Sequence, residues 1–295
     1  MEILVAKSAG FCFGVEKAIE SVYKEIETEK KPIYTFGPII HNEQVVEDLE
    51  EKGVSVIDTI EELENLQSGS VVIRSHGVPK KIYDAIEKQN LEIVDATCPF
   101  VKKIHNIVKK ESEKGKRIVI IGNDNHPEVE GIKGWVVGEA IVIKDEEDIE
   151  KIDSFRNESI CIVSQTTFNY NKFKYLVEII TKKGYDINVV NTICNATHLR
   201  QVEAKEIASK VDAMIVIGGK NSSNTQKLYD ICKNECKDTY YIQTVSNLNL
   251  KNVDSLRSIG ITAGASTPKK IIEEVVLNVR DEFWTNVGWI IQDNS

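Results

Sequence analysis

The stretch EILVAKSAGFC, residues 2–12, is a short apolar run that leads into a glycine-containing turn and a cysteine. Similar stretches occur twice more, as LEIVDATC at 91–98 and INVVNTIC at 187–194. Each pattern predicts a β-strand, a turn, a cysteine and then a helix. The three cysteines are 86 and 96 residues apart, and 101 residues follow the last one. We interpret this spacing as three copies of one structural unit.

Short apolar runs alternate with helical segments along the whole chain. The runs are nearly continuous, which is typical of parallel strands covered on both faces. Segments such as 101–114 and 199–210 have apolar residues at helical spacing and charges elsewhere. We therefore predict an α/β fold of three pseudo-repeated α/β lobes with mostly parallel sheets, built from right-handed βαβ units. The runs are PIYTFG (32–37), SVVIRS (70–75), LEIVDA (91–96), RIVIIG (117–122), AIVIKD (140–145), ICIVSQ (160–165), INVVNT (187–192), AMIVIG (213–218) and IGITAG (259–264).

Two polar loops follow each cysteine at matching distances. The first loop comes 28 or 29 residues after the cysteine, and the second comes 64 to 72 residues after it. Ligands of open parallel sheets bind at the carboxyl ends of the strands. Three lobes that face inward would therefore gather three thiols and six polar loops at one centre. In chain order the loops carry His41 and His76, then His126 and Thr166, then Ser222 and Ser266.

The repeat also predicts where the lobes begin and end. We expect lobe 1 over residues 13–97, lobe 2 over 98–193 and lobe 3 over 194–280. The strand within residues 1–12 has no lobe of its own, so we expect it to complete lobe 3. Residues 281–295 are expected to form a C-terminal tail.

Composition and charge exclude several classes of protein. The chain is 41% hydrophobic and 28% charged, as in an ordinary globular protein. Its net charge of −9 and isoelectric point near 5.3 argue against a general nucleic-acid surface. No apolar run approaches the ~20 residues of a membrane span, and the N-terminus lacks a signal-peptide pattern. We expect a cytoplasmic protein whose six cysteines are reduced thiols or metal ligands.

Cys12 lies at a rigid corner. A thiol at a helix N-terminus is expected to have a lowered pKa, and the thiolate is the form that ligates iron or zinc. Gly10 and Gly14 allow a tight turn and a close approach to a bulky ligand. Phe11 and Phe13 flank the thiol and are expected to exclude water from it.

Three cysteines at matched corners favour metal ligation over burial in the core. Around one iron–sulfur cluster, three thiolates leave one iron without a protein ligand, whereas fully ligated clusters usually take four. Zinc is the rival metal, in a closed site of three cysteines and a histidine, although no two cysteines have the short spacing of zinc ribbons. We expect Cys161 in the core. We interpret Cys232 and Cys236 as incidental, with a weak metal site as the alternative.

The segment GGKNSSNT, 218–225, precedes a predicted helix. Its backbone N–H groups, together with Ser222, Ser223 and Asn224, can cradle an anion, although an ordinary loop and helix cap has the same composition. The same two interpretations, an anion-binding loop or an ordinary loop, apply to two further segments. These are TAGAST with Ser266 and SQTT with Thr166.

Taken together, these stretches resemble the 4-hydroxy-3-methylbut-2-enyl diphosphate reductase family, the last enzyme of the non-mevalonate isoprenoid pathway. The motifs occur in family order over nearly the whole chain. Departures are modest, in FCFGV around Cys12 and in ICNATHLRQ around Cys194. The matching stretches are GFCFGVEKAI (10–19), HN (41–42), SHGV (75–78), DATCP (95–99), GNDNHPEVEG (122–131), SQTT (164–167), GGKNSSN (218–224) and TAGAS (262–266).

The resemblance implies a three-lobed fold around one 4Fe–4S cluster and a set of site residues. It implies three cluster ligands, Cys12, Cys98 and Cys194, and an open iron. It places Glu128, Thr166 and His126 near the substrate hydroxyl as catalytic residues, with His126 and Thr166 also binding substrate. It implies that the diphosphate is bound by His41, His76, Ser222, Ser223, Asn224 and Ser266.

The implied reaction is reductive dehydroxylation of 4-hydroxy-3-methylbut-2-enyl diphosphate to isopentenyl diphosphate and dimethylallyl diphosphate. Two electrons pass through the cluster, the hydroxyl binds the open iron, and Glu128 protonates it through Thr166 or the diphosphate. A low-potential electron donor such as ferredoxin or flavodoxin is implied, because the sequence shows no flavin or nicotinamide motif.

Three other classes remain open on the residues alone. A non-redox iron–sulfur hydro-lyase would use the open iron without an electron donor. An iron–sulfur sensor or electron carrier would favour four thiolates and would need no anion cradle. A zinc-stabilised interaction module is the third alternative.

Overall fold

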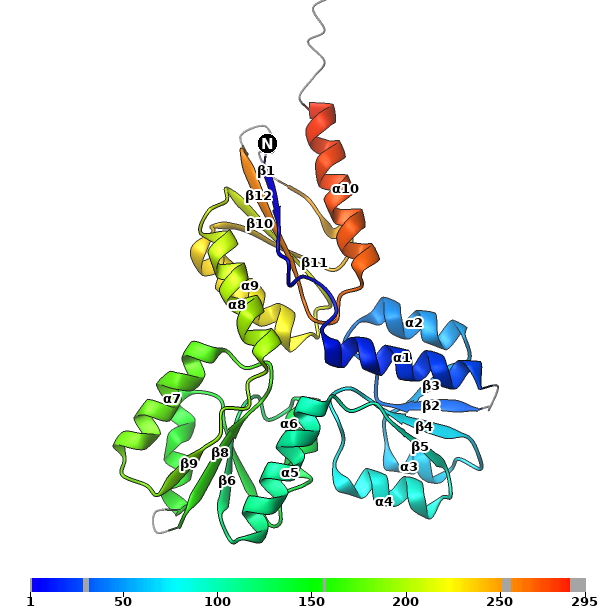
Figure 1. Cartoon of the computed structure of the whole chain (residues 1–295), viewed down its shortest axis with the longest axis vertical. Coiled ribbons are helices and arrows are strands. Elements are labelled where there is room, and N and C mark those ends of the chain that lie inside the picture. The colour runs from blue at the N-terminus through cyan, green and yellow to red at the C-terminus, as the bar shows by residue number, and fades with distance from the viewer. Residues whose placement is uncertain (1, 29–31, 156–157, 251–255, 287–295) are drawn as a thin grey trace, which may run out of the picture. The chain divides into compact units, whose positions relative to one another are not determined.

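The computed structural model describes residues 2–28, 32–155, 158–250 and 256–286. It contains three four-stranded sheets, and every strand pair in them is parallel. Helices cover both faces of each sheet (Figure 1). The predicted α/β fold of three lobes with parallel sheets is confirmed. The chain divides into two compact units, one formed by Cys12–His198 and the other by Met1–Phe11 with Leu199–Ser295.

Lobe 1 is the first half of the Cys12–His198 unit. Its central strand β4 is buried at all four positions, as its sequence SVVI predicts. The apolar residues of α3 and α4 pack on one face of the sheet, with Leu63, Ile82 and Ile86 almost fully buried. The elements are α1 (Phe13–Glu27), β2 (Ile33–Phe36), α2 (Glu43–Glu51), β3 (Val54–Ile57), α3 (Ile60–Glu64), β4 (Ser70–Ile73), α4 (Lys80–Lys88) and β5 (Glu92–Asp95).

Lobe 2 is the second half of the same unit. Its central strands β6 and β8 are apolar almost throughout and are covered on both faces. Helices α5 and α6 contribute Ile104, Val108 and Ile132 to one face, while α7 covers the other face. The elements are α5 (Pro99–Glu113), β6 (Arg117–Ile121), α6 (Pro127–Lys133), β7 (Ala140–Ile143), the 3-10 helix η1 (Glu146–Phe155), β8 (Ile160–Ser164), α7 (Tyr170–Lys182) and β9 (Ile187–Val189).

The third sheet joins the two ends of the chain. Strand β1 pairs with β12, with Glu2 opposite Ser258. Arg200 donates from Nε to the carbonyl oxygen of Ser8 over 2.8 Å and so holds the segment after β1. The elements are β1 (Glu2–Val5), α8 (Asn195–Ala208), β10 (Ala213–Ile217), α9 (Ser223–Glu235), β11 (Asp238–Ile242), the 3-10 helix η2 (Val245–Asn247), β12 (Ser258–Ala263) and α10 (Lys269–Asn286).

All three sheets share one strand order. The orders are β3-β2-β4-β5, β7-β6-β8-β9 and, read from the other edge, β11-β10-β12-β1. Strand β1 thus takes the place that β5 and β9 take in the other two sheets. Each of the three repeated cysteines follows one of these edge strands. The polar loops follow the two central strands of each sheet, so thiol and loops lie at the same strand ends.

Two details of the fold differ from the sequence-based expectation. Strands β3 and β11 lie in segments that were not among the predicted runs, because VSVI and DTYYI are short and carry polar residues. The tail expected from residue 281 begins inside α10, which continues to Asn286. Residues 287–295 of that tail lie outside the described residues.

A tight contact joins lobes 1 and 2. The indole Nε1 of Trp135 donates to the carbonyl oxygen of Val78 over 3.0 Å. The same indole stacks on His105 with ring centroids 5.3 Å apart. Gly134 ends α6 directly against Pro79, where an added Cβ would lie 2.6 Å from the Pro79 Cα. The loop after β4 and the end of α6 are therefore packed together without spare space.

Over the ranges that the structure describes, no helix is both long enough and apolar enough to span a membrane.

Replacing Gly134 by alanine tests this contact. The added methyl group has no room beside Pro79, so we expect a loss of about 1–3 kcal/mol in the free energy of unfolding, as for other overpacked sites. Denaturant unfolding measures this loss. The control is Glu139→Ala at an exposed position, which should change the free energy of unfolding by less than about 0.5 kcal/mol. Equal stability of the Gly134→Ala variant and the parent would contradict the close packing of the two lobes.

Candidate functional site

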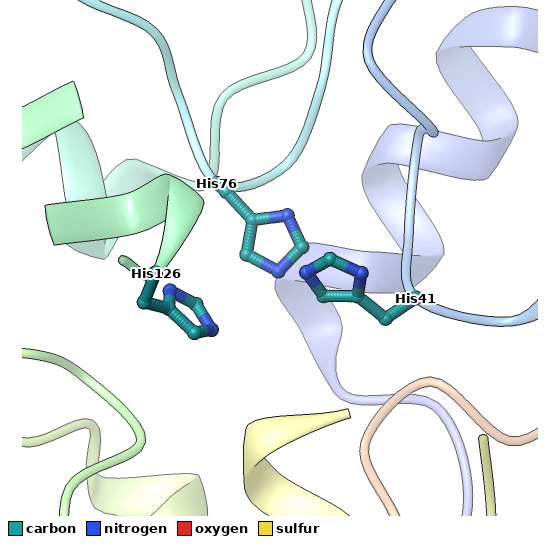
Figure 2. Close-up of side chains that lie close together, drawn as sticks. All are labelled: His41, His76 and His126. Atoms are coloured by element: carbon teal, nitrogen blue, oxygen red, sulfur yellow. The ribbon is translucent and has the colours of Figure 1, made fainter. Parts of the chain in front are cut away.

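Three histidines meet at the strand ends of lobes 1 and 2. His41 follows β2, His76 follows β4, and His126 is the N-cap residue of α6. Figure 2 shows the three imidazoles turned toward one another. Their ring centroids are 4.5 Å apart for His41 and His76, 5.9 Å for His41 and His126, and 5.6 Å for His76 and His126. One ring nitrogen of each lies within 4.8 Å of the others.

Burial keeps these imidazoles neutral. It lowers the pKa of His126 to about 3 and the pKa of His76 well below its usual value, and it lowers that of His41 as well. The positive charge of Arg74 lowers all three pKa values further. Each ring therefore offers one N–H donor and one acceptor near neutral pH.

Arg74 is a site residue that the sequence reasoning did not single out. Its guanidinium lies against Gly37, and burial lowers its pKa while Glu130 and Asp58 support the charge. Gly37 has a φ of +70°, and any side chain there would collide with the guanidinium. A basic residue directly after a buried strand and two positions before His76 was the signal available in the sequence.

The charge next to the histidines indicates which ligand they suit. Three neutral imidazoles this close together can ligate a transition metal. The Arg74 guanidinium, however, acts on all three rings and repels a cation placed among them. N–H donors beside a permanent positive charge favour an anion instead.

The orientation of His126 is fixed by the start of α6. Its Nδ1 accepts the backbone N–H of Glu128 over 3.1 Å. A neutral imidazole that accepts at Nδ1 carries its proton on Nε2. His126 therefore presents an N–H donor at its Nε2 end.

Glu128 is a buried acid held by a threonine. Its side chain is 1% exposed, and its two carboxyl oxygens accept the N–H and the hydroxyl of Thr166, each over 2.6 Å. Burial raises the pKa of Glu128 to about 7, although both bonds from Thr166 lower it. Near neutral pH the group is thus balanced between holding and releasing a proton.

The three repeated cysteines begin three helices. The carbonyl oxygens of Cys12, Cys98 and Cys194 accept the N–H four residues later over 2.9, 3.0 and 3.0 Å, as the residue at a helix start does. Gly14 lies against Cys98, where an added Cβ would lie 3.1 Å from the Cys98 Cβ and collide with its sulfur. The absence of a side chain at position 14 therefore leaves room for the Cys98 thiol.

The expected lowering of the thiol pKa is wrong for two of these cysteines. Burial raises the pKa of Cys98 to about 11 and also raises that of Cys194. The N–H groups of the following helix lower both values, but neighbouring thiols add to the rise. Desolvation thus outweighs the helix terminus, and a bound cation is what would favour the thiolate form.

The thiols are electrostatic neighbours, since Cys12 and Cys194 both act on Cys98. Within the described part of the chain, their three sulfur atoms do not all lie within 4.8 Å of one another, as the imidazole nitrogens do.

Backbone hydrogen bonds connect the thiol corners to the polar loops. The N–H of Cys98 donates to the carbonyl oxygen of Ser75, next to His76, over 3.0 Å. The N–H of Cys194 donates to the carbonyl oxygen of Thr166, also over 3.0 Å. A displacement of either loop therefore displaces a thiol.

The remaining cysteines are buried within single lobes. Cys161 lies in β8 at 0% exposure. Cys232 and Cys236, at 0% and 5% exposure, direct their sulfurs at backbone carbonyl groups. These positions are those of core residues.

The serine-rich loop lies in the other compact unit. Ser222 is the N-cap residue of α9, and its Oγ accepts from the N–H of Thr225 over 3.3 Å. The Oγ of Ser266 donates to the Oγ of Ser222 over 3.5 Å. Ser223 begins the helix, and the side-chain amide of Asn224 is 4% exposed with no hydrogen-bond partner among the described residues. A buried amide without a partner is costly unless a ligand satisfies it.

Comparison with known proteins extends this description. A family model described as LytB protein matches residues 3–280. The 4-hydroxy-3-methylbut-2-enyl diphosphate reductase of Caldanaerobacter subterraneus subsp. tengcongensis is 49% identical over 282 residues, which cover 95% of this chain and 97% of that protein.

Two solved structures share the fold. The E-1-hydroxy-2-methyl-but-2-enyl-4-diphosphate reductase of Plasmodium falciparum superposes with a TM-score of 0.89 at 29% identity, over 94% of this chain and 87% of that one. The second structure is an (E)-4-hydroxy-3-methyl-but-2-enyl diphosphate reductase, described as the terminal enzyme of the non-mevalonate pathway. It superposes with a TM-score of 0.70 at 41% identity, over 95% of this chain and 100% of that one.

The fold and these relatives define the class of the protein as an α/β enzyme, an oxidoreductase. The chain belongs to the LytB family, a family of iron–sulfur reductases.

The raised pKa of Glu128 predicts a pH-dependent stability. The folded state favours the protonated acid, so this contribution is complete below the ordinary pKa of 4.5 and is lost as the pH rises to about 7. The stability of the parent relative to Glu128→Gln should fall over this interval and level off above it. Thermal unfolding from pH 4 to pH 8 measures the difference, with Glu139→Gln, an exposed position, as the control. A parent-to-variant difference that is constant with pH would contradict the buried acid.

Proposed function

We propose that this protein is a 4-hydroxy-3-methylbut-2-enyl diphosphate reductase. The reaction removes the allylic hydroxyl as water with two electrons and two protons and forms isopentenyl diphosphate and dimethylallyl diphosphate. The observation that carries the proposal is the buried pair of Glu128 and Thr166 next to three imidazoles and Arg74. An acid with a pKa of about 7 supplies a proton, and the adjacent groups suit an anionic substrate.

We propose that Cys12, Cys98 and Cys194 hold one 4Fe–4S cluster. Three soft thiolate donors at matching helix starts fit such a cluster. When bound, the cluster would supply a Lewis-acidic iron without a protein ligand and a path for electrons. Gly14 and the backbone bonds of Cys98 and Cys194 keep the three corners in place.

We propose Glu128 as the acid that protonates the departing hydroxyl. A hydroxyl leaves far more readily as water than as hydroxide, so a positioned proton lowers the barrier. Thr166 holds both carboxyl oxygens through its N–H and its hydroxyl, and it can pass a proton between Glu128 and a substrate oxygen. His126 lies at the start of the same helix and presents its Nε2–H as a further donor.

We propose two sets of groups as ligands of the diphosphate. Each set is inferred separately, from the hydrogen-bond donors that it contains. His41, His76 and His126 offer N–H donors beside Arg74. In the other compact unit, Ser222, Ser223, Asn224 and Ser266 offer hydroxyl, amide and helix N-terminal donors, and the unpartnered amide of Asn224 supports a ligand there. Neutral donors of these kinds suit a diphosphate in a protein of net charge −9.

The proposed reaction needs an external source of electrons. A low-potential carrier such as ferredoxin or flavodoxin is the donor we propose, because no nicotinamide or flavin motif occurs in the sequence. We also propose a cytoplasmic location, since all six cysteines are free thiols, as a reducing compartment maintains them.

The ligand assignment predicts a division among the six cysteines. Cys12→Ser, Cys98→Ser and Cys194→Ser should each lose most of the bound iron, because a serine hydroxyl is a poor cluster ligand. Cys161→Ser, Cys232→Ser and Cys236→Ser are the matched controls and should keep their iron. Iron and sulfide analysis of anaerobically purified protein measures this. Equal losses in both groups would show that the ligands lie elsewhere.

The proton-donor role predicts a selective effect of Glu128→Gln. The amide has nearly the same volume, so iron content and substrate affinity should stay close to those of the parent. It cannot deliver a proton, so turnover should fall by a factor of about 10²–10⁴. Anaerobic turnover per cluster, measured with the exposed substitution Glu139→Gln as the control, tests this. Turnover within twofold of the parent would mean that Glu128 has only a structural role.

A further inference from the structure

Helix α5 is basic in an otherwise acidic protein. The whole chain has a net charge of −9. Residues 99–110, the first three turns of α5, contain no acidic residue. Their four cations are Lys102, Lys103, Lys109 and Lys110.

One face of α5 is exposed along this basic segment. Val101, Ile104 and Val108 are buried in lobe 2. The exposed positions, at helical spacing, are Pro99, Phe100, Lys103, Asn106 and Lys110. Most of them, with Lys102 and Ile107, line a shallow groove along the helix.

Within the ranges that the structure describes, the two exposed lysines, Lys103 and Lys110, have no acidic partner. Lys102 pairs with Asp95 over 2.7 Å, and Lys109 lies 3.9 Å from Glu113. For Lys103 and Lys110, the described residues provide no ion pair. Their charges are therefore available to a partner.

This face begins at the thiol centre. Cys98 is the N-cap residue of α5, so Lys103 lies ~8 Å and Lys110 ~18 Å farther along the helix axis. Phe100, two residues after Cys98, is 47% exposed. Phe13, directly after Cys12, is 63% exposed. Aromatic rings are enriched at contact surfaces between proteins, and complementary charges around such a surface steer the encounter.

We propose that the exposed face of α5, with Phe100, Lys103, Asn106 and Lys110, docks the acidic surface of a small one-electron carrier protein. This inference rests on the proposed function, which requires two electrons per substrate. Two successive dockings would each oxidise one carrier by one electron. With these two electrons the substrate C–O bond breaks, one proton leaves with the hydroxyl as water, and a second proton forms a C–H bond on the remaining allyl group. Complementary charge accelerates such an encounter, and the contact at the N-terminal end of α5 keeps the carrier near the thiols.

Charge reversal on α5 tests the proposal in the complete, cluster-loaded protein. The test variant is the double substitution Lys103→Glu and Lys110→Glu. Its matched control is Lys174→Glu and Lys182→Glu on α7, which changes the net charge equally on another face of lobe 2. The probes are a reduced bacterial ferredoxin, an acidic carrier, and reduced methyl viologen, a small dye that needs no docking surface.

We expect kcat/KM for ferredoxin to fall ~10-fold or more in the α5 variant and to change less than ~2-fold in the α7 control. Added salt should slow the parent and barely affect the α5 variant, because its steering charges are gone. With methyl viologen, all three proteins should turn over alike. A loss with methyl viologen as well, an equal loss in the α7 control, or no loss in the α5 variant would each overturn the proposal.

A binding measurement separates this proposal from the proposed function. Calorimetric titration of the cluster-loaded protein with oxidised ferredoxin, without substrate, should give a Kd that rises ~10-fold or more in the α5 variant only. An unchanged Kd would overturn the docking surface whatever the turnover. A parent that binds ferredoxin through α5 but does not convert the diphosphate with methyl viologen would overturn the proposed function and leave the docking surface supported.

Discussion

Parallel pairing of four strands in one fixed order determines where the thiols and polar loops of each lobe lie. Parallel strands have all their carboxyl ends at the same end of a sheet, so the loops after β2 and β4 lie together in one sheet and those after β6 and β8 lie together in another. The contacts of His126 with His41 and His76 join the loops of the two sheets. The fourth strand of each sheet ends in the turn that carries a cysteine. Backbone bonds from Cys98 to Ser75 and from Cys194 to Thr166 then fix each thiol to the adjacent polar loop. The thiols and the polar loops are thus placed by the same pairing.

Burial shifts the pKa values of the acid and of the imidazoles in opposite directions, and the physical cause is the same for both. It raises the pKa of Glu128 to about 7 and lowers that of His126 to about 3, because a desolvated site disfavours charge of either sign. The acid keeps its proton longer and the imidazole remains neutral. Arg74 is the charge that persists beside them, supported by Glu130 and Asp58. A site of this kind favours an anion and retains a proton for it, which is what the proposed dehydroxylation requires.

Much of this was predictable from the sequence, and the remainder depends on tertiary contacts. The apolar runs predicted ten of the twelve strands in the described residues, and the repeat predicted three lobes, because continuous apolar runs and repeated motifs can be recognised without tertiary context. Strands β3 and β11 were missed since their four or five residues carry too little signal. The thiol pKa was predicted in the wrong direction, because desolvation of Cys98 depends on neighbours distant in sequence. Arg74 was missed for the same reason, since its role follows from Gly37 and three histidines on separate loops.

We propose that this protein removes a hydroxyl by reduction at a three-thiolate centre. The most direct measurement is the electron stoichiometry of the reaction, with anaerobic cluster-loaded protein, 4-hydroxy-3-methylbut-2-enyl diphosphate and reduced methyl viologen, and with products identified by NMR. Two viologen radicals should be oxidised for each isopentenyl or dimethylallyl diphosphate formed. Loss of water without viologen oxidation, or viologen oxidation without loss of the hydroxyl, would contradict the proposed reaction.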